Sequence, residues 1–141
     1  MKKSICILLL FVIIYGCITD KTDQLPKITA DMIDPENPPV IEFSSAEFNF
    51  DTIAMGATVS HTFTFTNAGK TPLIIHSVKA ACGCTVLKGW PKHPILPGDS
   101  GEIPIEFSPK SPGAQRKYIS IIANTRPATN RLFLKGQVVG I

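Results

Sequence analysis

The stretch Thr58-Val59-Ser60-His61-Thr62-Phe63-Thr64-Phe65-Thr66 decides the fold of this chain. Bulky side chains alternate in it with small polar ones, and a period of two is the signature of a β-strand with one buried face. We therefore predict that Val59, Phe63 and Phe65 face a core. The threonines then face water, where their β-branching still favours a strand.

The same kind of alternation recurs on the C-terminal side, within residues 72–80, 102–107, 117–123 and 131–139. Further strands are expected at Val40–Phe43 or Phe48–Ile53, and at Thr85–Leu87. Gly136 inside the last of these segments predicts a β-bulge. No helical period persists, and 12 prolines argue against a helical bundle because each one removes a backbone donor.

About seven strands in about 100 residues, with a turn signal every 8 to 12 residues or so, are typical of one architecture. We predict an all-β fold, an immunoglobulin-like antiparallel β-sandwich, with an open barrel as the alternative. The Cys…Trp…Cys spacing of true immunoglobulin domains is absent. The core is therefore expected to depend on apolar packing, chiefly by Phe63, Phe65, Phe107 and Phe133.

Composition excludes several classes of protein. A length of 141 residues allows one domain with tails. The net charge of +3 is too small to indicate a nucleic-acid binder. Four cysteines are too few for a disulfide-built scaffold at this length.

Residues 1–16 are predicted to be a signal peptide. Lys2 and Lys3 precede an unbroken apolar run, Ile5–Tyr15. Such a run spans only about half of the ~30 Å hydrocarbon core of a membrane, which is too short for a transmembrane helix. A basic start followed by a short apolar run is typical of secretion.

The end of this run resembles the lipobox of bacterial lipoproteins: Ile14-Tyr15-Gly16-Cys17 places a small residue before a cysteine. We therefore expect lipidation of Cys17 and attachment to the membrane by the acyl chains, against the alternative of cleavage elsewhere and a soluble product. Residue 18 is Ile rather than Asp. By the sorting rule that this resemblance implies, the outer membrane is favoured over the inner one.

Removing residues 1–16 from the 141 leaves 125, and the charge on them is uneven. Residues 17–42 hold two basic and six acidic side chains, a net −4, together with four prolines. We interpret them as a lipidated N-terminus and flexible tether. Residues 43–141 hold ten basic and five acidic side chains, a net +5, and are predicted to form the sandwich.

Several motifs together resemble a known family. They are Phe48-Asn49-Phe50-Asp51-Thr52-Ile53, His61 to Lys70, Pro72-Leu73-Ile74-Ile75, Ala81-Cys82-Gly83-Cys84-Thr85 and Gly101-Glu102-Ile103. Over about residues 43 to 139 the chain resembles the bacterial domain of unknown function 1573, common in Bacteroidetes lipoproteins. That domain is similar to immunoglobulin-like domains of the MSP and Hydin type. The resemblance implies no activity. The family usually has Gly where Asp51 stands, so the turn there is expected to differ.

Cys82 and Cys84 are the thiols that remain once Cys6 is removed with the leader and Cys17 is lipidated. Three roles stay open for them. An exported compartment permits a disulfide, Gly83 lets the chain turn to close it, and a bridge in so small a ring is suited to exchange. Two thiolates with an imidazole, from His76 or His93, would suit Cu(I) or Zn(II). The third role is that of small apolar residues in a tight turn.

No pair of carboxylates, Ser/His/Asp set or phosphate-binding glycine loop is apparent, so we expect no enzyme, no catalytic residue and no cofactor. The sequence instead favours a lipoprotein of the cell envelope whose sandwich binds an unidentified envelope protein, with its edge strands as the candidate contact, and binds no nucleic acid. The alternative is thiol–disulfide exchange or metal handling through Cys82 and Cys84.

Trp90 is interpreted as covering an end of the sandwich rather than as a contact hot spot.

Overall fold

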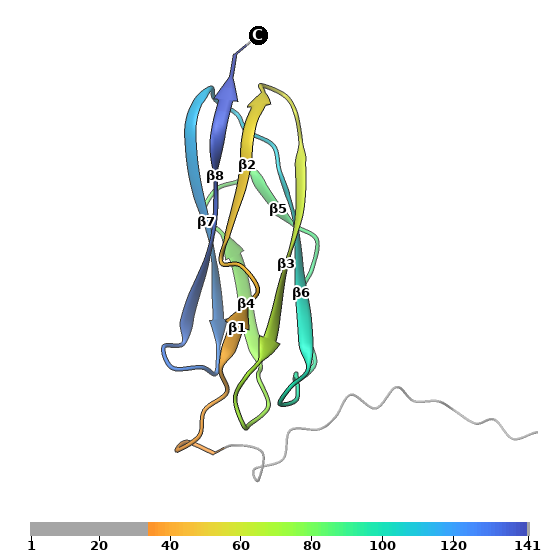
Figure 1. The fold of residues 1–141 in the computed structure, drawn as a ribbon, viewed down its shortest axis with the longest axis vertical. Helices are drawn as coiled ribbons and strands as arrows, with labels where there is room; N and C mark the ends of the chain where they lie inside the picture. The colour runs from red at the N-terminus through yellow and green to blue at the C-terminus, as the bar shows by residue number, and fades with distance from the viewer. Residues whose placement is uncertain (1–33, 141) are drawn as a thin grey trace, which may run out of the picture.

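The computed structural model describes residues 34–140, which form two packed layers of β-strand (Figure 1). Eight strands lie in this described part: β1 (Ile41–Phe43), β2 (Glu47–Ala54), β3 (Val59–Asn67), β4 (Ile75–Ala80), β5 (Thr85–Leu87), β6 (Ser100–Phe107), β7 (Gly113–Ala123) and β8 (Thr129–Val139). The predicted signal peptide, the predicted lipidation site Cys17 and most of the predicted tether lie outside these residues.

The strands form two four-stranded sheets. Sheet A has the order β1-β3-β6-β5, and sheet B has the order β2-β8-β7-β4. The prediction of an immunoglobulin-like sandwich is confirmed. Strands β1, β3, β6 and β5 of sheet A correspond to strands A, B, E and D of that fold, and β4, β7 and β8 of sheet B correspond to strands C, F and G. The strand count is one higher than expected because both candidate N-terminal segments form strands, one in each sheet.

The sequence predicted antiparallel sheets, but sheet B contains one parallel pair of strands. β2 pairs with β8 in parallel, whereas the other pairs are antiparallel. The chain leaves β1 at the edge of sheet A, crosses to sheet B and continues alongside β8 (Figure 1). Each sheet thereby gains an edge strand from the same N-terminal segment.

The core lies between the sheets and follows the predicted alternation. Phe63, Phe65 and Phe107 are almost fully buried. Phe133 was predicted to join them, and that prediction is wrong. Its neighbours Leu132 and Leu134 are fully buried, so a period of two places Phe133 on the outer face of β8, where it is half-buried.

The strand predicted from Pro72 begins later, at Ile75. Leu73 instead forms an isolated bridge with Ile95, in which each backbone N–H donates to the other's carbonyl. The register against β7 shifts between Ile75 and Ser77. Ile75 and Val78 are therefore both buried, although residues three apart in a regular strand face opposite sides of the sheet. A bulge of this kind breaks the alternation that a sequence pattern relies on.

The segment before β1 packs against the domain. The Pro39 ring is buried, the Ala68 N–H donates to the Val40 carbonyl at 2.9 Å, and the Thr71 hydroxyl donates to the Asn37 carbonyl at 2.9 Å. β1 itself begins at Ile41, two residues before the predicted start of the domain. Residues 37–42, assigned to the tether from sequence, therefore belong structurally to the sandwich.

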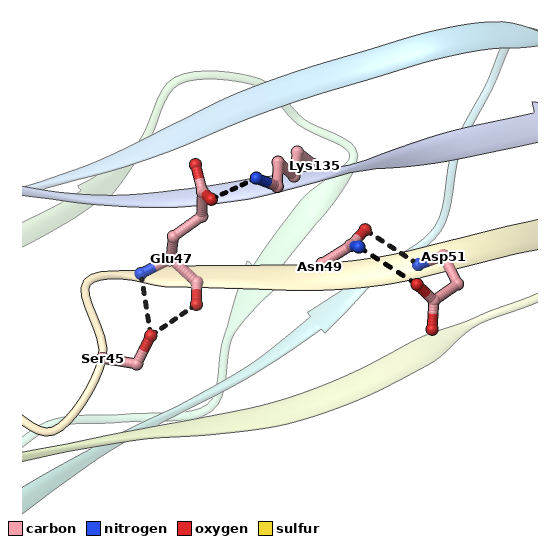
Figure 2. Close-up of polar contacts among 5 residues, drawn as sticks. All are labelled: Ser45, Glu47, Asn49, Asp51 and Lys135. Carbon is pink, nitrogen blue, oxygen red and sulfur yellow. Dashed lines mark hydrogen bonds and ion pairs between the residues drawn. The ribbon is translucent and has the colours of Figure 1, made fainter.

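A bulge lies in β2 opposite Gly136. Asn49 pairs with Lys135 and Thr52 with Gln137, so two residues of β2 face the one glycine of β8. The bulge was predicted from Gly136, and it is β2 that carries the extra residue. Asp51 has a φ of 56°, and Figure 2 shows its N–H and carboxylate bonded to the Asn49 side-chain amide, at 3.1 and 3.0 Å.

Asn67 is a fully buried polar residue at the end of β3. Its side-chain Nδ2 donates to the carbonyls of Thr71 (2.8 Å) and Ile95 (2.9 Å). Its Oδ1 accepts from the Gly69 N–H at 3.0 Å. One amide thus joins backbone groups of two loops, and it supplies the partner of the Thr71 carbonyl and a second partner for the Ile95 carbonyl.

Candidate functional site

The Cys82-Gly83-Cys84 segment forms the loop that takes the chain from β4 in sheet B to β5 in sheet A. The two sulfurs are bonded in a disulfide, with Cα atoms 5.3 Å apart. The side chains of Cys82 and Cys84 are half-buried. The Thr85 hydroxyl lies 3.8 Å from the Cys82 sulfur.

The disulfide faces a hollow in the surface. Its other lining residues come from the β6–β7 loop and the start of β7: Lys110, Ser111, Gln115 and Lys117. Both charged side chains among these are lysines, and no carboxylate lines the hollow. The sulfurs therefore lie beside a positively charged, hydrogen-bonding surface.

A second candidate site lies on the outer face of sheet B, where Arg116 and Tyr118 of β7 lie beside Arg131 and Phe133 of β8. We call these four side chains the Arg–aromatic face. Tyr118 and Phe133 are directly opposed in the β7–β8 register. The Arg116 guanidinium lies 4.6 Å from the centre of the Phe133 ring, and that of Arg131 lies 5.3 Å from the centre of the Tyr118 ring. Each arginine covers the aromatic ring diagonally across the strand pair.

The surroundings of the Arg–aromatic face are basic and partly apolar. Lys79 and Lys135 point outward on the same sheet, and the carboxylate of Glu47 is paired with Lys135 at 2.5 Å (Figure 2). Three large apolar side chains remain exposed on this face: Tyr118 at 43%, Ile122 at 38% and Val139 at 44%.

Sequence analysis missed this face. The alternation in residues 117–123 already separated Tyr118 and Ile122 from Ile119 and Ile121, although it did not say which side faces the core, so part of the signal was present. What it lacked was the β7–β8 register, which places Arg131 beside Tyr118.

His61 and Trp90, both considered from sequence, pack at the margins of the core. The His61 ring stacks on Phe48 at a centroid distance of 3.9 Å, and burial lowers the pKa of His61 below its ordinary 6.5. Trp90 packs against the buried cluster, with the Lys92 ammonium 2.9 Å from its ring centre. Its indole N–H is buried without a hydrogen-bond partner among the described residues.

The metal alternative has no assembled ligand set in the described part of the chain. Within residues 34–140, no three His, Cys, Asp or Glu side chains gather closely enough to hold an ion. Across the same residues, no helix has the length and apolar character needed to cross a membrane.

The fold and its two candidate sites define an immunoglobulin-like β-sandwich domain with a basic, aromatic outer face and a disulfide loop at the crossing between sheets. The sequence profile of the family described as protein of unknown function DUF1573 matches residues 41–138. The chain belongs to that family. No curated protein matches it.

Solved structures with similar folds come from bacteria and from human. A protein of unknown function from Porphyromonas gingivalis W83 is 24% identical with a TM-score of 0.62; the alignment covers 70% of this chain and 46% of that one. The secreted serine protease VesC from Vibrio cholerae is 12% identical with a TM-score of 0.58, covering 70% and 23%. The PapD-like domain 7 of human CEP192 is 17% identical with a TM-score of 0.53, covering 82% and 95%.

These identities establish a shared fold and nothing about activity. The chain spans about half the length of the Porphyromonas structure and about a quarter of the Vibrio protease. It covers nearly all of the human domain, so a sandwich of this size exists as a separate module in a larger protein.

Proposed function

We propose that this protein is a non-enzymatic, lipid-anchored binding module of the cell envelope, whose Arg–aromatic face contacts a partner protein. The observation that carries the proposal is the exposed pairing of Arg116 with Phe133 and of Arg131 with Tyr118. Tyrosine and arginine are enriched among the residues that dominate binding energy at protein interfaces. Isolated exposed apolar residues need no explanation, but exposed Ile122 lies diagonally across from Arg131 and extends the two arginine–aromatic pairs into a patch.

The face supports binding better than the edge strands do. Sheet A ends in β1 and β5, which are three residues each and offer few backbone groups to an added strand. Sheet B ends in β2 and β4, and the backbone of each is irregular, at Asn49–Thr52 and at Ile75–Ser77 respectively. Bulges and short edges are features by which sheets avoid pairing with further strands.

A crosslinking experiment in intact cells tests the face. A photoreactive phenylalanine analogue replaces Tyr118 in one strain and Leu96, an exposed apolar residue in the β5–β6 loop, in another. We expect a discrete protein adduct from position 118 only. Arg131→Glu in the first strain should abolish the adduct, whereas Lys70→Glu, in the β3–β4 turn, should not. Equal adducts from both positions, or an adduct that survives Arg131→Glu, would refute the proposal.

The anchor rests on Cys17. The lipobox-like Ile14-Tyr15-Gly16-Cys17 and the apolar run before it support acylation there, and the residues up to 33 then link the lipid to the sandwich. Metabolic labelling with a fatty acid should mark the wild-type chain and not Cys17→Ala. Membrane fractionation should place the labelled chain in the outer membrane, and label retained by Cys17→Ala would refute the anchor.

A further inference from the structure

We infer that Cys82 and Cys84 form a stoichiometric thiol–disulfide exchange site, a second function that does not depend on the Arg–aromatic face. The disulfide closes a loop with one residue between its cysteines, so it constrains little of the unfolded chain. A bond that contributes little to stability, in a surface loop beside two lysines, is better explained by chemistry than by architecture.

The loop does not depend on the disulfide for its position. On its N-terminal side the Ala81 N–H donates to the Tyr118 carbonyl at 3.0 Å, which ties it to β7. On its C-terminal side the Ser108 N–H donates to the Cys84 carbonyl at 2.9 Å, which ties it to the end of β6. Both bonds are between backbone groups. The two sulfurs therefore stay close when reduced, so the pair can be opened and closed without unfolding the domain.

The hollow beside the loop favours the reactive form of cysteine. Exchange proceeds through a thiolate, and neighbouring lysine ammonium groups stabilise thiolates. Lys110 and Lys117 line the same hollow as both cysteines, with no carboxylate to oppose them. The Thr85 hydroxyl, 3.8 Å from the Cys82 sulfur, is in position to donate a weak hydrogen bond to that sulfur.

The two sulfurs are not equivalent. Cys84 packs against the hydrophobic core, and Cys82 is not among the residues that do. The space around Gly83 is open: apart from its neighbours Cys82 and Cys84, no residue has an atom within 4 Å of the position where a side chain would begin. A partner thiol can therefore approach the loop from outside, and Cys82 is the sulfur that it reaches.

The proposed reaction takes two electrons from a dithiol protein. A partner thiolate attacks the sulfur of Cys82, the Cys82–Cys84 bond breaks, and Cys84 leaves as a thiolate. The partner's second thiolate then attacks the mixed disulfide and releases Cys82. The partner is oxidised to a disulfide, and the two protons from its thiols are taken up by Cys82 and Cys84. In the reverse direction, reduced Cys82 attacks a partner disulfide.

The test uses the full chain with Cys6→Ser and Cys17→Ser, so that Cys82 and Cys84 are the remaining thiols. In this background, Cys84→Ser leaves Cys82 alone and Cys82→Ser leaves Cys84 alone. Each variant reacts with 2-hydroxyethyl disulfide, an uncharged probe, and intact mass follows the mixed disulfide. We expect Cys82 to react about tenfold faster than Cys84 at neutral pH. Equal rates would overturn the assignment of Cys82.

The lysines are tested in the same assay. Lys110→Gln with Lys117→Gln should slow the reaction of Cys82 several-fold. A matched control, Lys70→Gln with Arg126→Gln, removes the same charge away from the hollow and should leave the rate unchanged. Cooperative thermal unfolding of every variant establishes that each remains folded. A Cys82 rate no greater than that of free cysteine, or one insensitive to the lysines, would overturn the exchange site.

Discussion

Gly136 of β8 lies against the ring of Phe50 so closely that a β-carbon on Gly136 would collide with it and with the carbonyl of Asp51. The β2 bulge directs Phe50 into the core at this point, where its ring is 5.1 Å from that of Phe107. Gly136→Ala should therefore destabilise the domain by about 2–3 kcal/mol, because buried backbone and ring must shift. Urea unfolding measures this. Gly140→Ala, which meets no atom within 4 Å, is the control and should change stability little.

Asp51 is the one non-glycine residue of the described chain with a positive φ. Asp51→Gly should be nearly neutral, within about 1 kcal/mol, because glycine adopts this conformation freely while the bond to the Asn49 amide is lost. Asp51→Val should cost about 2 kcal/mol, since a β-branched residue fits this region poorly. Chemical denaturation of the two variants compares these costs, and equal losses would contradict this account.

Asn67→Leu should be among the most damaging single changes in the chain. It leaves the Thr71 carbonyl and the Gly69 N–H without their partner, and it removes one of the two hydrogen bonds to the Ile95 carbonyl, which keeps the Leu73 N–H. At about 1–3 kcal/mol for each unsatisfied group, the expected loss is about 3 kcal/mol or more. Thermal and urea unfolding measure it. Asn49→Ala, an exposed asparagine, serves as the control and should cost less than about 1 kcal/mol.

The stability of the domain should depend on pH through His61, whose pKa is lowered by burial. Because the unfolded chain takes up a proton on this residue more readily than the folded one, the neutral histidine favours folding. The contribution is complete above the ordinary pKa of 6.5 and is lost as the pH falls from there through the lowered pKa of the folded state. The melting temperature, recorded between about pH 8 and pH 5, should fall less steeply in His61→Phe than in wild type. An equally steep fall in His61→Phe and in wild type would contradict this account.

Removing the disulfide should cost little stability. The chain-entropy argument gives about 1–2 kcal/mol for so short a loop, compared with about 3 kcal/mol for a loop of about fifteen residues. Cys82→Ser with Cys84→Ser should therefore retain a cooperative unfolding transition, only slightly lowered. A loss of more than about 4 kcal/mol would indicate a structural role and count against exchange.

The alternation of apolar and polar residues was enough to predict the sandwich and most of its core. It assigned Ile103, Ile105 and Phe107 to the buried face of β6, and the structure confirms this. It failed where the period of two is interrupted, as between Ile75 and Ser77, because a bulge shifts later residues to the other face. Phe133 was misplaced for a different reason: its hydrophobicity was given more weight than its position between two inward-facing leucines.

The candidate sites were only partly accessible from sequence. Cys82 and Cys84 stand two residues apart, so their proximity needed no fold. The lysines beside them come from a different loop and from β7, and no local pattern connects residues 110 and 117 with residues 82 and 84. Asn67 was similarly hidden, since a turn asparagine and a buried one look alike until the loops around it are placed.

The sequence by itself determined that the chain forms a β-sandwich, and it determined most of the side chains that the regular strands bury. These are local properties, set by backbone geometry and by the chemistry of neighbouring residues. Only the tertiary structure decided that β2 runs parallel to β8, that Gly136 lies against Phe50, and that Arg131 covers Tyr118. Those relationships depend on strand register, and register is fixed by the simultaneous packing of both sheets around one core.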